Sequence, residues 1–128
     1  MTLLLVMIGA AVGAPSRWLT DRAVQRRNDS VFPWGTFTVN IVGSLLLGFI
    51  VRATALGDVH HLWYAALGTG FCGGFTTFST FSYETFRLIE DGSVNIAGRN
   101  LGLSLGVGLL AAFGGWYLAV AVWGAAGA

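Results

Sequence analysis

The chain has 128 residues, of which 55% are hydrophobic and 10% are charged. Soluble domains carry about 25% charged residues, so this composition excludes a water-soluble globular domain. Seven basic residues face six acidic ones, a formal net charge of +1, so no excess of basic residues indicates binding to nucleic acid. The sequence therefore predicts an all-α integral membrane protein, with residues 1–128 forming a single domain.

Four segments are long and apolar enough to cross a bilayer, which takes about 20 helical residues. They cover residues 2–20, 33–55, 62–90 and 94–123. The first begins MTLLLVMIGAAVGA and could be taken for a signal peptide, but no basic residues precede its apolar run, which favours a membrane helix. Polar connections are expected at 20–31, around Asp58 and after Glu90.

Glycines recur at intervals of four in the first and fourth spans. Small residues at this interval let helix backbones approach closely in lipid, where no hydrophobic effect drives helices together. Four thin helices enclose little interior, so we expect an oligomer. The glycines concerned are Gly9, Gly13, Gly98, Gly102 and Gly106.

Polar residues also recur along one face of two spans. A polar group inside hydrocarbon is expensive unless it has a partner, so these rows are informative. Asn40 either joins two helices by a side-chain hydrogen bond or offers its amide protons to an anion, and both readings remain open. Two rows on two helices indicate a shared hydrated path. The rows are Thr36, Asn40 and Ser44, and Asn100, Ser104 and Gly108.

The third span contains GFCGGFTTFSTFSYE at residues 70–84. The poor helix formers from Gly73 to Thr77 predict a break at membrane depth. Carbonyls released at such a break suit a small monovalent cation. The alternative is that the glycines permit a close helix crossing and the hydroxyls bond to carbonyls one turn earlier. The residues alone leave both readings open.

Two phenylalanines and a carboxylate follow the expected break. Phe78 and Phe81 share a helical face, and the positive edges of their rings could line a path for an anion. Core packing is the commoner role of such residues. Glu84 lies inside an apolar span, where a carboxylate is either functional or reaches to the interface.

Three motifs resemble the Fluc fluoride-channel family of bacterial membrane proteins, also called CrcB. They are GAPSRW at 13–18, WGTFTVNIVGSLLLG at 34–48 and GFCGGFTTFSTFSYE at 70–84. The resemblance implies four transmembrane helices, the third broken mid-membrane, in an antiparallel, dual-topology dimer with two fluoride pathways. It also implies a structural sodium ion (Na⁺) on the dimer axis. The expected function is passive export of fluoride from the cytoplasm across the plasma membrane.

Carried over by position, the resemblance assigns roles to nine residues. It places the sodium-ligating carbonyls on Gly73 and Thr76 and a vestibule arginine at Arg17. Two positions depart from the family: Asn100 stands where a tyrosine is usual, and Gly108 where some members have serine. Both departures concern the outer polar track. The residues expected along the fluoride pathway are Asn40, Phe78, Phe81, Thr80, Ser104 and Glu84.

The arginines are distributed unevenly between the two expected membrane faces. Arg52 lies near one face, and the other six lie on the side of the first and third connections. Such a bias normally fixes one orientation. A heterodimer with a second homologous chain is therefore the alternative to a dual-topology homodimer.

Two rival functions remain. A proton-coupled exporter resembling the small multidrug transporters would need an essential carboxylate in its first helix, but span 2–20 has no acid, and Glu84 is the deep candidate elsewhere. A purely structural membrane subunit would not depend on Phe78 or Phe81. No nucleotide-binding or hydrolase motif is present, so we expect no enzyme.

Overall fold

The computed structural model describes residues 1–27, 32–55 and 60–124, which are helical apart from short connections and contain no strand. The polar residues expected at 28–31 and Asp58 lie outside these ranges. The elements are α1 (Thr2–Arg27), α2 (Trp34–Ala55), α3 (His61–Trp63), the π-helix η1 (Tyr64–Cys72), α4 (Gly73–Phe75), α5 (Ser79–Glu90), α6 (Val94–Ala119) and the π-helix η2 (Val120–Gly124).

Three helices of the described chain are long and apolar enough to cross a membrane, namely Thr2–Arg27, Trp34–Ala55 and Val94–Val122. They correspond to the first, second and fourth expected spans. The first helix runs on to Arg27, so part of the connection expected at 20–31 is helical, because alanine, glutamine and arginine are good helix formers. The third expected span is divided among α3, η1, α4 and α5.

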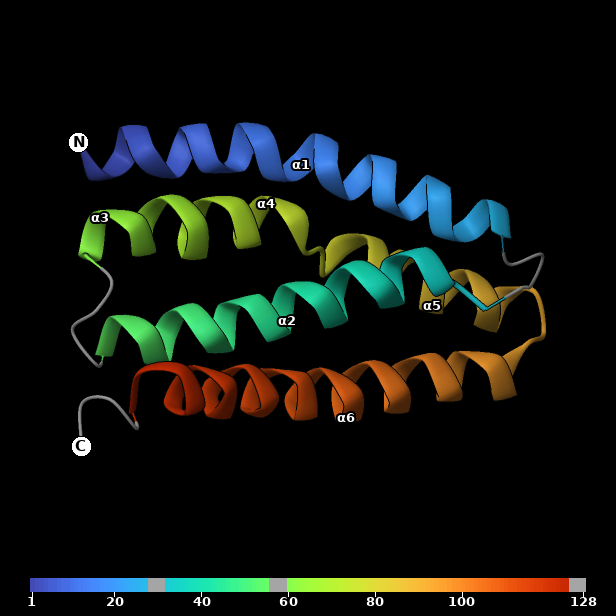
Figure 1. Cartoon of the computed structure of the whole chain (residues 1–128). Helices are drawn as coiled ribbons and strands as arrows, with labels where there is room; N and C mark the ends of the chain where they lie inside the picture. Colours follow the sequence, from blue (N-terminus) through green and yellow to red (C-terminus); the bar gives the residue numbers. More distant parts are fainter. Residues whose placement is uncertain (28–31, 56–59, 125–128) are drawn as a thin grey trace.

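The helices lie side by side, with α1 at one edge and α6 at the other (Figure 1). Between them, α2 packs along α6, while η1 and α4 pack along α1. Glycines make the α1 contact close, as their spacing predicts. A Cβ atom on Gly9 would collide with the Ala66 carbonyl, and one on Gly13 with the Phe71 carbonyl.

Three glycines of α6 make no close contact within one chain. A Cβ atom on Gly98, Gly102 or Gly106 would meet no atom within 4 Å. Leu101 and Leu105 are exposed beside them. Close packing at this face is therefore not made within one chain, because the neighbouring helix α2 contacts a different side of α6.

Helix α4 ends at Phe75 and α5 begins at Ser79, so the helix is interrupted at the threonine end of the stretch from Gly73 to Thr77. Gly73 to Phe75 are helical, and Thr76 is extended with ψ at 160°. A Cβ atom on Gly74 would lie 2.9 Å from the Ala10 carbonyl, so this glycine serves the crossing with α1. The Thr76 hydroxyl donates to the Cys72 carbonyl at 2.8 Å. Gly74 and the Thr76 hydroxyl thus act as the close-packing alternative describes, whereas Gly73 makes no such contact.

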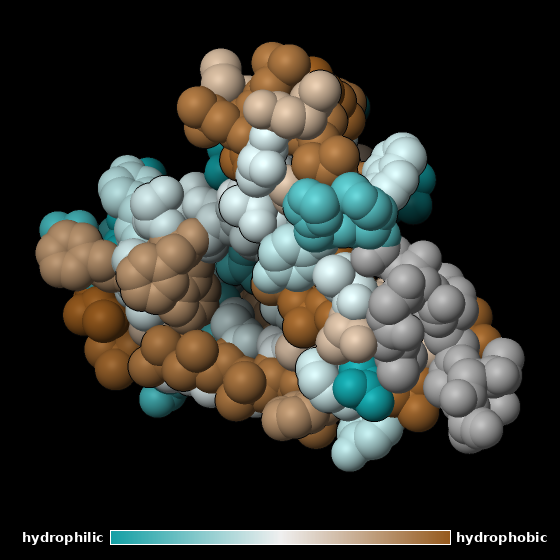
Figure 2. Space-filling view, turned by 90° about the vertical axis from the view of Figure 1, so that its left-hand side faces the viewer, coloured by the Kyte–Doolittle hydropathy of each residue, from teal (hydrophilic) through white to brown (hydrophobic). Residues whose placement is uncertain are grey.

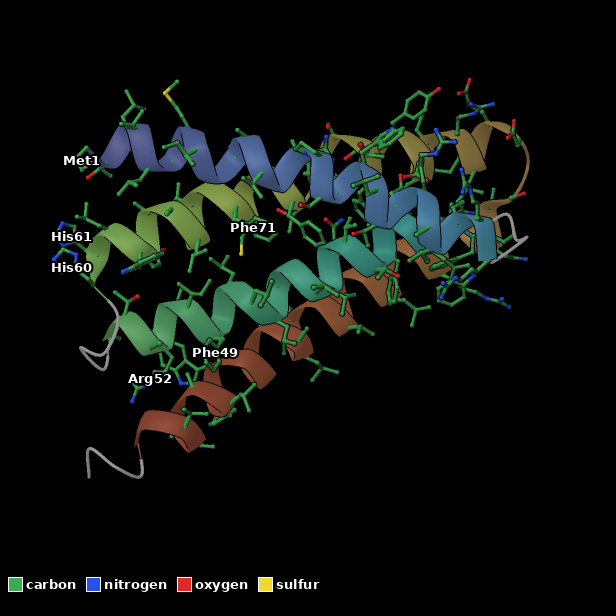
Figure 3. The ribbon with its side chains drawn as sticks, turned by 45° about the horizontal axis from the view of Figure 1, so that its top comes forward. Met1, Phe49, Arg52, His60, His61 and Phe71 are labelled. Carbon is green, nitrogen blue, oxygen red and sulfur yellow. The ribbon has the colours of Figure 1, made fainter. Side chains whose placement is uncertain are left out.

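Arginines lie at both ends of the molecule. Arg52 lies at the end that holds Met1, His60 and His61 (Figure 3), and its guanidinium stacks over the Trp116 ring with 4.9 Å to the centroid. Viewed onto that end, apolar side chains cover much of the outer surface (Figure 2). Arg26 and Arg27 end α1 at the opposite end, where α5 turns into α6 (Figure 1).

Candidate functional site: a polar groove between four helical segments

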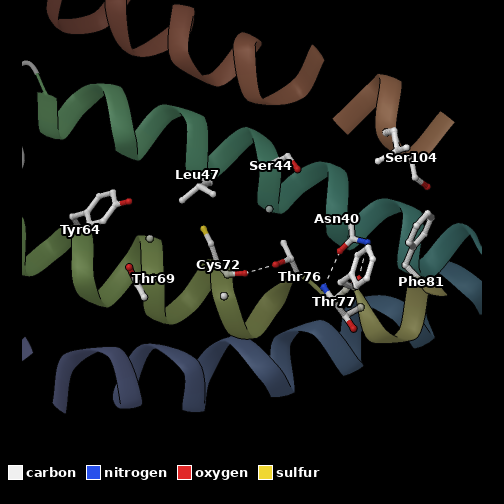
Figure 4. Close-up of a pocket in the computed structure, with 15 residues that line it drawn as sticks. Asn40, Ser44, Leu47, Tyr64, Thr69, Cys72, Thr76, Thr77, Phe81 and Ser104 are labelled. Atoms are coloured by element: carbon white, nitrogen blue, oxygen red, sulfur yellow. Dashed lines mark hydrogen bonds between the residues drawn. The ribbon is translucent and has the colours of Figure 1, made fainter. Parts of the chain in front are cut away.

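A groove of about 480 Å³ runs between α2, η1, the α4–α5 connection and α6 (Figure 4). Its lining includes no lysine, arginine, histidine or carboxylate among the residues that the structure describes. Hydroxyls, one amide, aromatic rings and apolar side chains form its wall instead. The polar and aromatic side chains include Asn40, Ser44, Thr69, Thr76, Phe81 and Ser104.

Asn40 joins α2 to the connection between α4 and α5. Its Nδ2 donates to the Thr77 carbonyl at 3.0 Å, and the Thr77 amide donates to its Oδ1 at 2.8 Å. Both ends of the Asn40 amide are therefore bonded to the backbone of Thr77, as the helix-joining interpretation predicts. A primary amide has two N–H donors, so one donor remains beyond this pair at the groove wall.

Two backbone carbonyls near this pair lack their usual helical donors. In an α-helix each amide donates to the carbonyl four residues earlier. The Thr77 amide donates to Asn40 instead of to the Gly73 carbonyl. The Thr80 amide likewise donates to the Thr77 hydroxyl at 3.2 Å, instead of to the Thr76 carbonyl. Gly73 and Thr76 both line the groove, and no atom lies within 4 Å of a Cβ added to Gly73.

The two phenylalanines lie next to each other at the groove but differ in burial. Their ring centroids are 6.1 Å apart and the rings are tilted by 45°. Phe81 is 7% exposed, whereas Phe78 is 78% exposed. The burial of Phe81 fits core packing. Phe78 has no such role within one chain, because most of its ring lies outside the packed interior.

Ser104 reaches the groove from α6, and Asn100 lies behind it. The sequence places both in one hydrated row, but Asn100 is 0% exposed. Its Nδ2 donates to the Thr85 hydroxyl at 2.8 Å, and its Oδ1 accepts from the Ser104 hydroxyl at 3.2 Å. The expectation of a continuous hydrated row is therefore wrong at Asn100, because the packing of α5 on α6 closes over it.

Three of the nine expected site residues are not in the lining of this groove. Glu84 accepts a hydrogen bond from the Thr36 hydroxyl and lies at a second pocket, of about 260 Å³, beside Arg87. Thr80 accepts from the Thr77 hydroxyl at 3.1 Å. Arg17 is half-buried on α1. The structure brings the other six together: Asn40, Gly73, Thr76, Phe78, Phe81 and Ser104.

Sequence reasoning did not assign Tyr64 or Thr69 to the site, although both line the groove. Residues five apart lie on different faces of an α-helix. Tyr64 to Cys72 form a π-helix, in which hydrogen bonds join residues five apart and bring such pairs onto a similar face. The spacing of Tyr64 and Thr69 becomes informative only when this helix type is known.

Three long apolar helices and an uncharged polar groove, in a chain whose described residues contain no strand, define a multi-pass integral membrane protein. The family model for CrcB-like protein, Camphor Resistance (CrcB), matches residues 4–116, and the chain belongs to this family. This confirms the resemblance that the three motifs indicate.

Similar proteins carry a consistent name. A protein of Frankia casuarinae, 54% identical over 97% of this chain and 100% of its own length, is named fluoride-specific ion channel FluC 1. A protein of Streptomyces avermitilis with the same name is 51% identical over 96% of this chain and 99% of its own length. A protein of Syntrophotalea carbinolica, named fluoride-specific ion channel FluC, is 44% identical over 93% and 98%. These names describe ion channels and no enzyme.

Proposed function

We propose that the chain is a fluoride-selective passive channel of the plasma membrane, through which fluoride leaves the cytoplasm. The observation that carries this proposal is the near full-length identity of 54% to a protein named as a fluoride-specific ion channel. Fluoride enters cells as neutral HF, which dissociates in the more alkaline cytoplasm. A passive pathway for the anion is then sufficient to remove it.

The chemistry of the groove supports this proposal. Fluoride is small and strongly hydrated, so a selective path must replace its water with other donors. The spare N–H of Asn40, the hydroxyls along the groove and the edges of the Phe78 and Phe81 rings supply such donors. None of them carries a fixed positive charge. Several weak sites allow the ion to leave again, which conduction requires.

A second copy of the chain in the antiparallel orientation completes the proposed channel. Its most direct support is the unpartnered face of α6, where Gly98, Gly102 and Gly106 lie open. Small residues at this interval suit close helix contact in lipid. The exposed Phe78 ring beside the groove is a second group that a partner could cover. In such a dimer each chain contributes one groove, which gives two pathways.

The residues around Gly73 and Thr76 fit a monovalent cation such as sodium. Both carbonyls have lost their usual helical donors to Asn40 and to the Thr77 hydroxyl. Carbonyl oxygens are hard ligands and suit such an ion at a helix interruption. We propose that these two carbonyls from each of two chains hold one structural ion. Bound there, it would offset the desolvation of the freed carbonyls and join the two copies.

Purified protein in liposomes tests the channel proposal directly. Vesicles loaded with potassium fluoride should release fluoride when valinomycin balances the charge, and vesicles loaded with potassium chloride should retain chloride. Equal chloride release would contradict the proposal, and so would retention of fluoride.

Topology needs its own measurement. A cysteine-reactive probe applied from either side of the membrane to a C-terminal tag should label about half of the chains on each side, if the dimer is an antiparallel homodimer. One-sided labelling would instead establish a fixed orientation and require a second homologous chain.

A further inference from the structure

The buried amide of Asn100 lies directly behind Ser104, a hydroxyl at the wall of the groove. We propose that Asn100 is a positioning residue that competes with fluoride for the Ser104 proton. On this proposal the Ser104 hydroxyl donates to Asn100 when no anion is near. It turns its proton into the groove only when an anion replaces Asn100 as the acceptor. The inference rests on the proposed function and deepens it.

The direction of the hydrogen bonds follows from the number of protons. A threonine hydroxyl has one proton, and that of Thr85 goes to the Phe81 carbonyl at 2.8 Å. Thr85 must then accept from Asn100, which places Nδ2 toward Thr85 and leaves Oδ1 toward Ser104. Oδ1 can only accept, so Ser104 donates to it at 3.2 Å.

This order determines what Ser104 presents to the groove. A serine hydroxyl also has a single proton, so a Ser104 that donates to Asn100 turns lone pairs toward the groove. Lone pairs repel an anion. Coordination of fluoride by Ser104 therefore requires the exchange of one hydrogen bond for another. The 3.2 Å separation from Asn100 is longer than the usual range of about 2.5–3.0 Å for a hydroxyl donor, so this exchange gives up a weak bond.

The burial of Asn100 keeps its acceptor oxygen available to Ser104 alone. The side chain is 0% exposed, so no water competes for its Oδ1. Thr85 fixes the amide from the other side at 2.8 Å, which prevents a simple exchange of the oxygen and nitrogen positions. The acceptor therefore faces Ser104 permanently, while the groove side of Ser104 is open to the permeating ion.

A double-mutant cycle in liposomes tests the proposal. Asn100→Leu removes the acceptor, Ser104→Ala removes the proton, and the cycle is completed by the variant that carries both. Thr85→Val is nearly isosteric and is a second way to free the Ser104 proton. It removes the acceptor that holds Nδ2 of Asn100, so the amide can rotate and turn Nδ2 toward Ser104. Asn95→Leu, at an exposed asparagine of the same helix, is the matched control. Initial fluoride efflux is measured at low internal fluoride concentration.

We expect Asn100→Leu to raise efflux about fivefold when Ser104 is present, since a net hydrogen bond is worth about 1 kcal/mol. In the Ser104→Ala background the same substitution should change efflux less than about twofold. Thr85→Val should raise efflux in the same Ser104-dependent way, and it decides the outcome if Asn100→Leu fails to fold.

An equal change in both backgrounds would assign Asn100 a structural role only and overturn the proposal. A fall in efflux that depends on Ser104 would also overturn it. Wild-type protein that releases no fluoride would instead contradict the proposed function, so the two failures are distinguishable.

Discussion

The side-chain amide of Asn40 forms two hydrogen bonds with the backbone of Thr77. Nδ2 donates to the Thr77 carbonyl at 3.0 Å, and the Thr77 amide donates to Oδ1 at 2.8 Å. The pair holds α2 against the connection between α4 and α5. It also diverts the amide that would otherwise occupy the Gly73 carbonyl. One side chain thus supports both the interruption of the helix and the polar wall of the groove.

Asn40→Leu should therefore affect stability and transport together. It leaves the amide and carbonyl of Thr77 without partners, and each unsatisfied buried group costs about 1–3 kcal/mol. We expect a lower melting temperature in detergent and at least a tenfold fall in fluoride efflux, or about 1.4 kcal/mol in barrier height. Asn95→Leu serves as the control. Unchanged efflux and stability would show that the pair is dispensable.

Phe78→Ile and Phe81→Ile should separate transport from folding. Both remove a ring edge from the groove, so both should lower fluoride efflux by about tenfold or more. Phe81 is 7% exposed, and its substitution should also lower stability by about 1 kcal/mol. Phe78 is 78% exposed, and its substitution should leave the stability of the single chain unchanged. Normal efflux in both variants would favour a purely structural role for the protein.

Gly9→Val and Gly102→Val should have different consequences, although both glycines belong to rows with the same spacing. A side chain at Gly9 collides with the Ala66 backbone, so this variant should fold poorly. Gly102 has open space around it within the chain, so its variant should fold. If a second copy packs there, that variant should be monomeric in detergent by light scattering. A dimer of normal size would remove the α6 face from the proposed interface.

Glu84→Gln should retain fluoride efflux to within about threefold, because glutamine keeps an acceptor for the Thr36 hydroxyl. A proton-coupled exporter would lose activity, since the variant cannot carry a proton. Glu84→Leu is the companion variant. It leaves the Thr36 hydroxyl, which is 2% exposed, without its acceptor and should lower stability by about 1–3 kcal/mol. Loss of pH-driven drug exchange in Glu84→Gln would favour the exporter.

Removal of sodium should destabilise the assembled protein. A ligand that binds only the folded dimer stabilises it by about 2.7 kcal/mol at a concentration of one hundred times Kd. Replacing sodium with N-methyl-D-glucamine should therefore lower the melting temperature and promote dissociation. The stabilisation should saturate as the sodium concentration rises. Exchanging choline chloride for choline nitrate, which changes only the anion, should leave the melting temperature unchanged. Identical melting curves with and without sodium would contradict the proposed ion site.

Several features of this protein are readable from its sequence. The low charge and the long apolar runs place α1, α2 and α6 in a membrane, because few other environments stabilise such surfaces. The motifs around Asn40 and Gly73 indicate the family, which the comparison over residues 4–116 confirms. The four-residue spacing of Gly9 and Gly13 correctly predicts a close helix contact.

Other features depend on how the segments pack. Periodicity puts Asn100 and Ser104 on one face of α6, but α5 covers the first and leaves the second at the groove. The π-helix of η1 brings Tyr64 and Thr69 to the groove at a spacing that an α-helix would separate. Glu84 bonds to Thr36 and lies at a second pocket outside the groove.

The sequence by itself determined the environment of the chain, its family and the short list of polar side chains inside its apolar segments. These follow from composition and local spacing, which are properties of the chain alone. Tertiary structure decided which of those polar groups pair with each other and which face the groove. A hydrogen bond such as that between Asn40 and Thr77 joins residues 37 positions apart, and no local pattern specifies its partner.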